Sequence, residues 1–413
     1  MSISNLVATS ECCQHESLLR EAPVVQKGGP IAPASHGYAS SVLRRRLATA
    51  FAHASIFLGI MTASFPVAEF VFRLLGDEPS FDLRGLYAPF ASGNYKLGPE
   101  VETSARFASG PLSVYTDAFG LRCDKAKRFA ADRREPIDIL LVGDSQGFGN
   151  GVNFEDTIGG SMATLAAKQG YHVSNASVGG HSLASQLQLA RWLVDEQGLR
   201  VKNFVLLLTP AMIHSPDKLN QAIVGDDGRL YGELTTRARL RVWAKSNLVV
   251  YSRLRDAVRN LGIGDDPTEG SSTVLSFYDA GGEQSTGQDA LLDTVEKFKN
   301  FAAIHGAAMQ MVYVPLAVEA TFESVRQAAA KQNIRLDPDV SFRIAESVAR
   351  RAGIPLHDLR PVLQRAHSDG QVLIVKGDFH YSPVVSRACG ARLWADLAMP
   401  PRKNNSTSAN RPN

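Results

Sequence analysis

From Ile137 onward, short apolar runs alternate with stretches whose apolar residues recur at helical spacing. The apolar runs predict strands at 137–142, 171–175, 203–208, 310–314 and 354–358. The stretches between them predict helices at 155–168, 183–197, 287–304, 318–331 and 340–352. Because strands and helices alternate in this way in βαβ units, we predict an α/β domain with a mainly parallel sheet.

A separate apolar run, 47–68, contains no Asp, Glu, Lys or Arg and follows the basic block Arg44-Arg45-Arg46. It is long enough to cross a bilayer as a helix. The positive-inside rule places the basic end in the cytoplasm and the rest of the chain on the other side. A buried core helix and a cleaved signal peptide are the alternatives. The region that precedes the apolar run is longer than the region that precedes it in secretory signal peptides, which favours an uncleaved signal anchor.

The chain is accordingly divided into a flexible cytoplasmic tail (1–43), a transmembrane signal anchor (44–70), an extracytoplasmic linker and N-terminal extension (71–136), a main domain (137–398) and a second flexible tail (399–413). Residues 214–285 fit no simple crossover between strands. We interpret them as an insertion over the strand ends, because active-site lids are often long insertions of this kind.

Charge and cysteine usage exclude several classes of site. The net charge is +3, much of the excess lies in the Arg44-Arg45-Arg46 block, and no long basic stripe interleaved with aromatics follows, so nucleic acid is not an expected partner. The cysteines form no CxxC pair and no zinc-like spacing, so no metal or cofactor is expected: Cys12, Cys13, Cys123 and Cys389. A domain of this size also needs no disulfide to be stable.

The run 137–142 leads directly into Gly143-Asp144-Ser145 and a glycine-rich turn. Ligands of α/β sheets bind at the carboxyl ends of the strands, and Gly143 permits a tight turn that exposes the Ser145 hydroxyl and N–H together. A generic loop serine is the alternative. The glycines are spaced GxGxG rather than GxGxxG, which argues against a dinucleotide-binding loop. The lysine of a P-loop is missing, which excludes that phosphate-binding motif. The Asp144 carboxylate either caps this turn or orients Ser145.

Asp378 and His380 lie two residues apart near the C-terminus, and side chains at this spacing in an extended segment face the same way. A carboxylate beside a histidine fixes its tautomer and stabilises the imidazolium that forms when it takes a proton. A serine hydroxyl becomes a good nucleophile only with such a base beside it. A surface turn is the alternative interpretation of this triplet.

These two motifs, together with Asn-Ala-Ser-Val-Gly-Gly at 175–180, resemble in type and order the GDSL/SGNH hydrolases, in particular their membrane-anchored bacterial members. The resemblance covers about 137–395. It implies a three-layer α/β/α, flavodoxin-like hydrolase domain with Ser145 as the nucleophile, Ser145 and Gly180 as oxyanion-hole N–H donors, and Asp378 and His380 completing a triad. The Asp-x-His spacing departs from the Asp-x-x-His of many members.

A second departure concerns the asparagine that the family usually carries after the third strand. This chain has Thr209-Pro210-Ala211-Met212 there. Loss of one oxyanion donor costs roughly 2.7–4 kcal/mol in kcat, so the hole is either weaker or completed elsewhere. His181 and His214 are candidate substitutes, and surface or structural roles are their alternatives.

The resemblance implies acyl transfer through an acyl-serine intermediate, without cofactor. We expect an esterase that removes acetyl or another small acyl group from an O-acylated carbohydrate or other small ester. An O-acyltransferase with a sugar acceptor remains an alternative, and so does a catalytically silent binding module, which the missing asparagine favours. The expected location is the inner membrane, spanned once by 47–68, with the catalytic domain in the periplasm.

Overall fold

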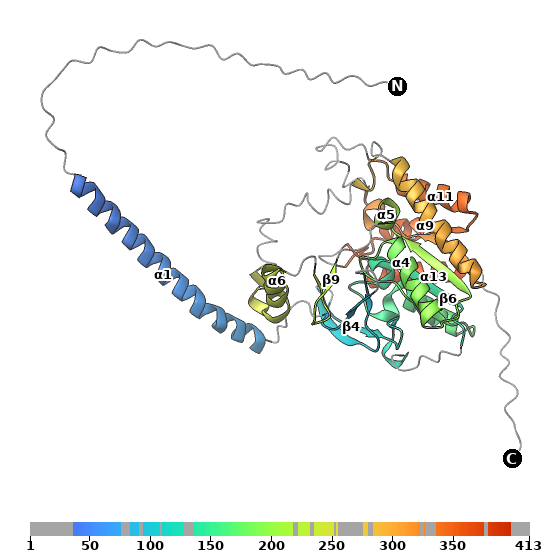
Figure 1. The fold of residues 1–413 in the computed structure, drawn as a ribbon, viewed down its shortest axis with the longest axis horizontal. Helices are drawn as coiled ribbons and strands as arrows, with labels where there is room; N and C mark the ends of the chain where they lie inside the picture. The colour runs from blue at the N-terminus through green and yellow to red at the C-terminus, as the bar shows by residue number, and fades with distance from the viewer. Residues whose placement is uncertain are drawn as a thin grey trace, which may run out of the picture. The chain divides into compact units, whose positions relative to one another are not determined.

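The computed structural model describes residues 36–75, 83–90, 94–107, 110–127, 135–217, 222–231, 235–251, 253–254, 276–279, 284–322, 326, 336–375 and 379–397. The chain divides into two compact units, residues 1–64 and 65–413. Figure 1 shows the fold, with strand β6 (Ile139–Gly143) and several of the helices labelled.

Helix α1 (His36–Leu74) contains an apolar stretch, Leu47–Leu74, of 28 residues with a mean hydropathy of 1.7. This stretch is long and apolar enough to cross a membrane, by length and composition alone. Large apolar side chains along it are exposed, including Phe51 at 76% and Ile56 at 61%. The apolar helix expected at 47–68 is therefore present, and its insertion into a membrane stays a proposal.

The described residues form an eight-stranded mixed sheet in the order β12-β11-β8-β6-β7-β5-β4-β3. Its five parallel strands are β6 (Ile139–Gly143), β7 (Val173–Asn175), β8 (Asn203–Leu208), β11 (Ala308–Tyr313) and β12 (Leu356–Asp358). Numbered along the chain, these five strands are ordered 2-1-3-4-5 across the sheet, as in flavodoxin-like folds. The predicted α/β class is confirmed, and each predicted strand has a counterpart.

Three further strands extend the sheet beyond β7 in antiparallel pairing: β3 (Glu102–Phe107), β4 (Gly110–Thr116) and β5 (Arg122–Cys123). They come from the segment 71–136, which the sequence suggested was a linker and extension. Along β4, Leu112 and Val114 are buried while Ser113 and Tyr115 are half-buried, the alternation of a strand with one covered face. The sheet of the main domain therefore starts well before residue 137.

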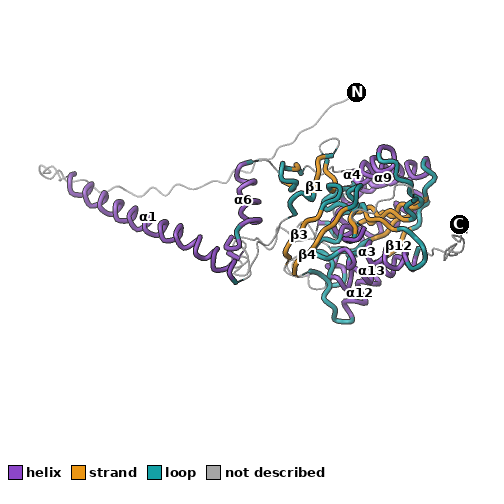
Figure 2. The backbone as a smooth tube through the Cα atoms, turned by 90° about the horizontal axis from the view of Figure 1, so that it is seen from below, coloured by secondary structure: helices purple, strands orange, loops and turns teal. Residues whose placement is uncertain are grey.

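Helices cover both faces of the sheet, as Figure 2 shows. On one face lie α4 (Leu183–Arg191), α9 (Gln284–Ile304) and α11 (Val340–Ala352), and on the other lie α3 (Ile158–Ala167), α12 (Arg360–Ser368) and α13 (Pro383–Asp396). Residues of β6 alternate between the two layers: Leu140 and Val142 join the first core, Ile139 and Leu141 the second. Both faces of β6 are thus apolar, which explains its continuous apolar sequence.

Four predicted helices correspond to α3, α4, α9 and α11, and α4 continues into a π-helical turn, Trp192–Glu196. The predicted helix 318–331 lies mostly outside the described residues. A 3-10 turn, Ala317–Glu319, marks its start.

The expected insertion, 214–285, is described in part. It contains a short hairpin of β9 (Ile223–Val224) and β10 (Leu230–Tyr231), followed by α6 (Thr236–Asn247). The hairpin contacts the extension, because Gly85 N–H donates to the carbonyl of Asp227 at 2.9 Å. Beside it, β1 (Tyr87–Pro89) pairs antiparallel with β2 (Tyr95–Leu97).

Candidate active site

The strand order of the parallel sheet reverses at β6, which has β7 on one side and β8 on the other. Open α/β sheets bind ligands outside the carboxyl ends of the strands at such a switch point. Ser145 follows β6, the glycines Gly179 and Gly180 follow β7, and Thr209 follows β8. The topology therefore gathers these residues at one edge.

Close packing around Gly143, the last residue of β6, fixes the position of the strand end that precedes Ser145. A Cβ there would lie 2.9 Å from the Leu207 Cβ and 3.2 Å from the Ser177 hydroxyl, so the strand end accepts glycine alone without rearrangement. Helix α2 (Ser145–Phe148) starts two residues later and ends at Gly149, whose φ of 80° is left-handed. The half-buried Ser145 is thus the first residue of a single helical turn.

Asp144 caps that turn. Its Oδ1 accepts the Gln146 N–H at 2.9 Å, and the Thr209 hydroxyl donates to its Oδ2. Burial raises the pKa of Asp144, while the hydrogen bonds from Thr209 and Gln146 and the nearby charge of His380 oppose that rise. The carboxylate is therefore held by its neighbours on the sheet edge and interacts electrostatically with His380.

The glycine turn after β7 lies against Ser145. A Cβ on Gly179 would contact the Ser145 Cβ at 3.6 Å, and Gly180 has a left-handed φ of 79°. The turn is anchored at both ends, since Val178 N–H donates to the Gly143 carbonyl at 3.0 Å and the Tyr95 hydroxyl donates to the Gly179 carbonyl at 2.8 Å. The turn therefore lies within van der Waals reach of the serine.

Asn175, the last residue of β7, ties this turn to α2. Its buried amide donates to the Gly147 carbonyl at 2.9 Å, and its Oδ1 accepts the Ser177 N–H at 3.0 Å. A single asparagine thereby fixes the position of the glycine turn relative to the serine helix.

His380 lies beside the same helical turn and is 4% exposed. Its Nδ1 is 3.4 Å from Asn150 Nδ2, and its ring stacks on Phe379 with ring centres 4.3 Å apart. The Gln146 side chain donates to the Phe379 carbonyl at 3.2 Å and accepts the Tyr381 N–H at 3.3 Å. The predicted partner of His380, Asp378, lies outside the described residues.

The two histidines considered as auxiliary donors are engaged elsewhere. His181 is buried, its Nε2 is 2.8 Å from the Tyr95 carbonyl oxygen, and burial lowers its pKa to about 4. His214, in α5 (Pro210–His214), has its Nε2 3.0 Å from the Ser341 hydroxyl, and burial lowers its pKa. These contacts join the histidines to β2 and α11 rather than to Ser145.

Arg122 is a residue of this site that the sequence did not single out. It is fully buried on β5 and donates hydrogen bonds to the carbonyls of Phe148, Gly149 and Val152, the bond to Gly149 measuring 2.7 Å. Burial lowers its pKa to about 9. The guanidinium lies over the Phe148 ring, 4.3 Å from its centre. Arg122 therefore braces the loop that follows the serine helix.

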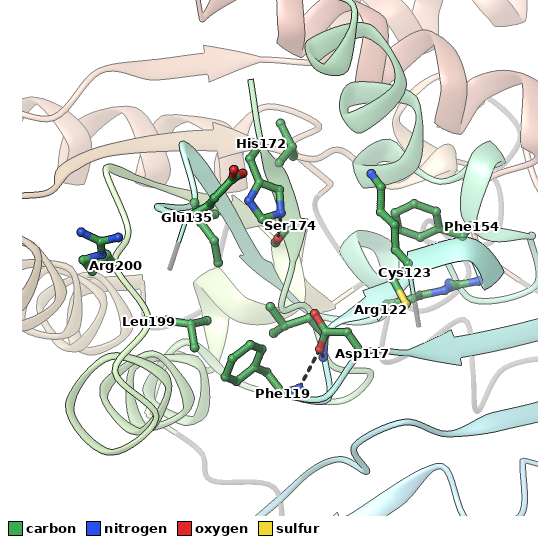
Figure 3. A pocket seen from close by; sticks show the side chains of 14 residues that line it. Asp117, Phe119, Arg122, Cys123, Glu135, Phe154, His172, Ser174, Leu199 and Arg200 are labelled. Carbon is green, nitrogen blue, oxygen red and sulfur yellow. Dashed lines mark hydrogen bonds between the residues drawn. The ribbon is translucent and has the colours of Figure 1, made fainter. Parts of the chain in front are cut away.

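A cavity of about 80 Å³, drawn in Figure 3, lies at the opposite end of the parallel strands from Ser145. Its lining includes Glu135 and Ile137, just before β6, and His172, just before β7. Burial raises the pKa of Asp117, also in its wall, to about 6. Because Glu135, Ile137 and His172 precede their strands, the cavity opens at the amino ends of β6 and β7, and Arg122 lies in its wall as well.

Among the described residues, no group of three His, Cys, Asp or Glu side chains lies close enough together to hold a metal ion. Cys389 is a buried free thiol on α13, so it is not bridged to Cys123.

No family model and no curated protein matches the sequence. Solved structures to which the chain is similar include TesA, with 16% identity and a TM-score of 0.32 over 63% of this chain and 98% of that one. The acetyl xylan esterase AlAXEase has 14% identity and a TM-score of 0.35 over 63% and 100%. A member of the lipolytic protein G-D-S-L family from Veillonella parvula has 12% identity and a TM-score of 0.33 over 63% and 97%. At these TM-scores the resemblance adds no argument about chemistry, which rests on the residues at the switch point.

Proposed function

We propose that this chain is a serine esterase in which Ser145 is the nucleophile and His380 its general base. The observation that carries the proposal is the bridge between two segments far apart in sequence. Gln146, the neighbour of Ser145, hydrogen-bonds the backbone on both sides of His380. A serine at a strand end and a buried histidine held next to its helical turn are the two groups that nucleophilic acyl transfer requires.

In the proposed reaction, the Ser145 hydroxyl oxygen attacks the ester carbonyl carbon while its proton passes to a ring nitrogen of His380. The N–H groups of Ser145 and Gly180 stabilise the oxyanion that forms. When the tetrahedral intermediate collapses, the bond to the alcohol breaks and His380 returns the proton to that leaving oxygen. Water then attacks the acyl-serine by the same route and releases the acid.

Asp378 is proposed as the carboxylate that orients His380, on the basis of the i, i+2 spacing. The proposed substrate is an O-acylated carbohydrate or other small ester. We also propose that Leu47–Leu74 anchors the enzyme in the inner membrane with the catalytic domain outside the cytoplasm, which the length and composition of that helix support.

Steady-state kinetics with p-nitrophenyl acetate test the roles of these residues. Ser145→Ala and His380→Ala should each lower kcat by about 10⁴–10⁶-fold, and the double variant should be scarcely worse, because the two residues serve one step. Asp378→Asn should cost no more than either. His357→Ala is the control, since the His357 Nε2 lies 2.6 Å from the amide oxygen of Gln310 on the neighbouring strand. Near-normal turnover by folded His380→Ala would exclude it as the base.

A further inference from the structure

Gln146 occupies the position directly after Ser145, yet its side chain points to a segment more than two hundred residues away. It is 3% exposed. Its Nε2 donates to the Phe379 carbonyl at 3.2 Å, and its Oε1 accepts the Tyr381 N–H at 3.3 Å. The two partners are the residues immediately before and after His380.

A glutamine is the side chain that these contacts require. One planar amide supplies both a donor and an acceptor, whereas glutamate lacks the donor at neutral pH, and methionine has no donor and only a weak sulfur acceptor. Other contacts of the 379–381 segment include the bridge between Ile374 and Tyr381, the bond from Val375 N–H to the His380 carbonyl, and the bond from the Tyr381 hydroxyl to the Pro315 carbonyl. Without Gln146, the buried Tyr381 N–H would lose its acceptor, which is costly away from water.

The backbone of Gln146 is itself fixed in place. Its backbone N–H donates to Asp144, and Asp144 accepts the Thr209 hydroxyl from the end of β8. Gln146 therefore connects the histidine segment to the same strand ends that set the position of Ser145.

We infer that Gln146 is a positioning residue that sets the placement of His380 relative to Ser145; this inference rests on the serine-esterase proposal above. A group misplaced by about 1 Å can cost about 100-fold in rate, whereas substrate binding does not depend on the base. Loss of the clamp should therefore lower kcat far more than it changes KM.

The test compares Gln146→Met and Gln146→Glu in the full-length protein with p-nitrophenyl acetate. The methionine variant should lose about 10–100-fold in kcat with KM within about 2-fold. The glutamate variant keeps the acceptor for Tyr381 and adds a negative charge, which stabilises the imidazolium. The acid limb of its kcat/KM profile should therefore move to higher pH. Gln288→Met is the control, because Gln288 makes a comparable bond to the Ser347 hydroxyl at 2.8 Å, on α9 and α11.

Amide hydrogen exchange at Tyr381 gives a second readout that does not depend on activity. Exchange should be faster in Gln146→Met than in wild type and unchanged in Gln288→Met. Wild-type kcat and an unshifted pH profile in folded Gln146 variants would overturn the inference, and so would unchanged exchange at Tyr381. Full activity of Ser145→Ala would instead reject the esterase proposal, while the exchange result would still decide whether Gln146 holds the histidine segment.

Discussion

Thr209 and Asp144 are joined by a hydrogen bond across the switch point of the sheet, from the end of β8 to the end of β6. Thr209 stands where the resembling hydrolases usually carry an asparagine. The Thr209 hydroxyl donates its hydrogen bond to the Asp144 carboxylate, so it does not serve as a donor to an oxyanion. The bond instead supports the turn that presents Ser145. At the position where the family's asparagine is missing, the strand end thus contributes structural support to the site.

Thr209→Val should destabilise the fold by roughly 1–3 kcal/mol, because it replaces the hydroxyl donor to a buried carboxylate with a methyl group of similar size. Urea denaturation measures the change. Thr294→Val is the matched control: the Thr294 hydroxyl is bonded to the Ala290 carbonyl within α9, and its loss should cost less. An equal decrease in the free energy of unfolding in the two variants would show that the Thr209–Asp144 bond stabilises the fold no more than an ordinary helix hydrogen bond.

Arg122→Met should destabilise the protein by roughly 3–5 kcal/mol. The substitution leaves the carbonyls of Phe148, Gly149 and Val152 without their buried donor, and each unsatisfied group carries a desolvation cost. Arg343→Met, which breaks a pair with Asp337 at the surface, should cost less than about 1 kcal/mol. A similar midpoint of denaturation for both variants would contradict the bracing role of Arg122.

Glu319 should make stability depend on pH. The hydroxyls of Tyr278 and Tyr313 donate to its Oε1, and burial raises its pKa from 4.5 to about 7. The folded protein therefore retains a proton that the unfolded chain releases between these values, so stability falls as pH rises from about 4.5 to 7. Glu319→Gln should reduce this fall and leave the part that comes from Asp117 and Asp144, whose pKa values burial also raises. Denaturation midpoints across this range test it, and an unchanged slope would refute it.

The membrane topology proposed for α1 predicts which reporter works at the far end of the chain. Alkaline phosphatase fused after residue 400 should be active, because the enzyme folds only outside the cytoplasm, and a cytoplasmic reporter at the same position should be silent. The opposite pattern would place the domain in the cytoplasm and reject the proposed anchor orientation.

The central strands β6 and β8 were predictable because they are buried on both faces and almost entirely apolar, as Ile139 to Val142 illustrate. It did not predict that β3, β4 and β5 join the same sheet. A pairing such as Arg122 with Asn175 links distant segments, and strand pairing between distant segments leaves no local periodicity.

The candidate site was predictable where a short motif carries it. Gly143, Ser145 and the glycine turn meet at one edge because the carboxyl ends of neighbouring strands must meet there. The contacts of Gln146 and Arg122 were not predictable, because both side chains bind backbone atoms of remote segments, and backbone carries no residue-type signal. The roles of Ser145, Asp378 and His380 stay predictions.

Labelling with a fluorophosphonate probe tests the central claim most directly, because the probe reacts with an activated serine whatever the natural substrate is. Wild-type protein should be labelled at Ser145, as located by mass spectrometry of its peptides, and His380→Ala should be labelled much more slowly. Ser145→Ala should not be labelled. A wild-type protein that folds but takes no label, or that takes it at another residue, would contradict the account.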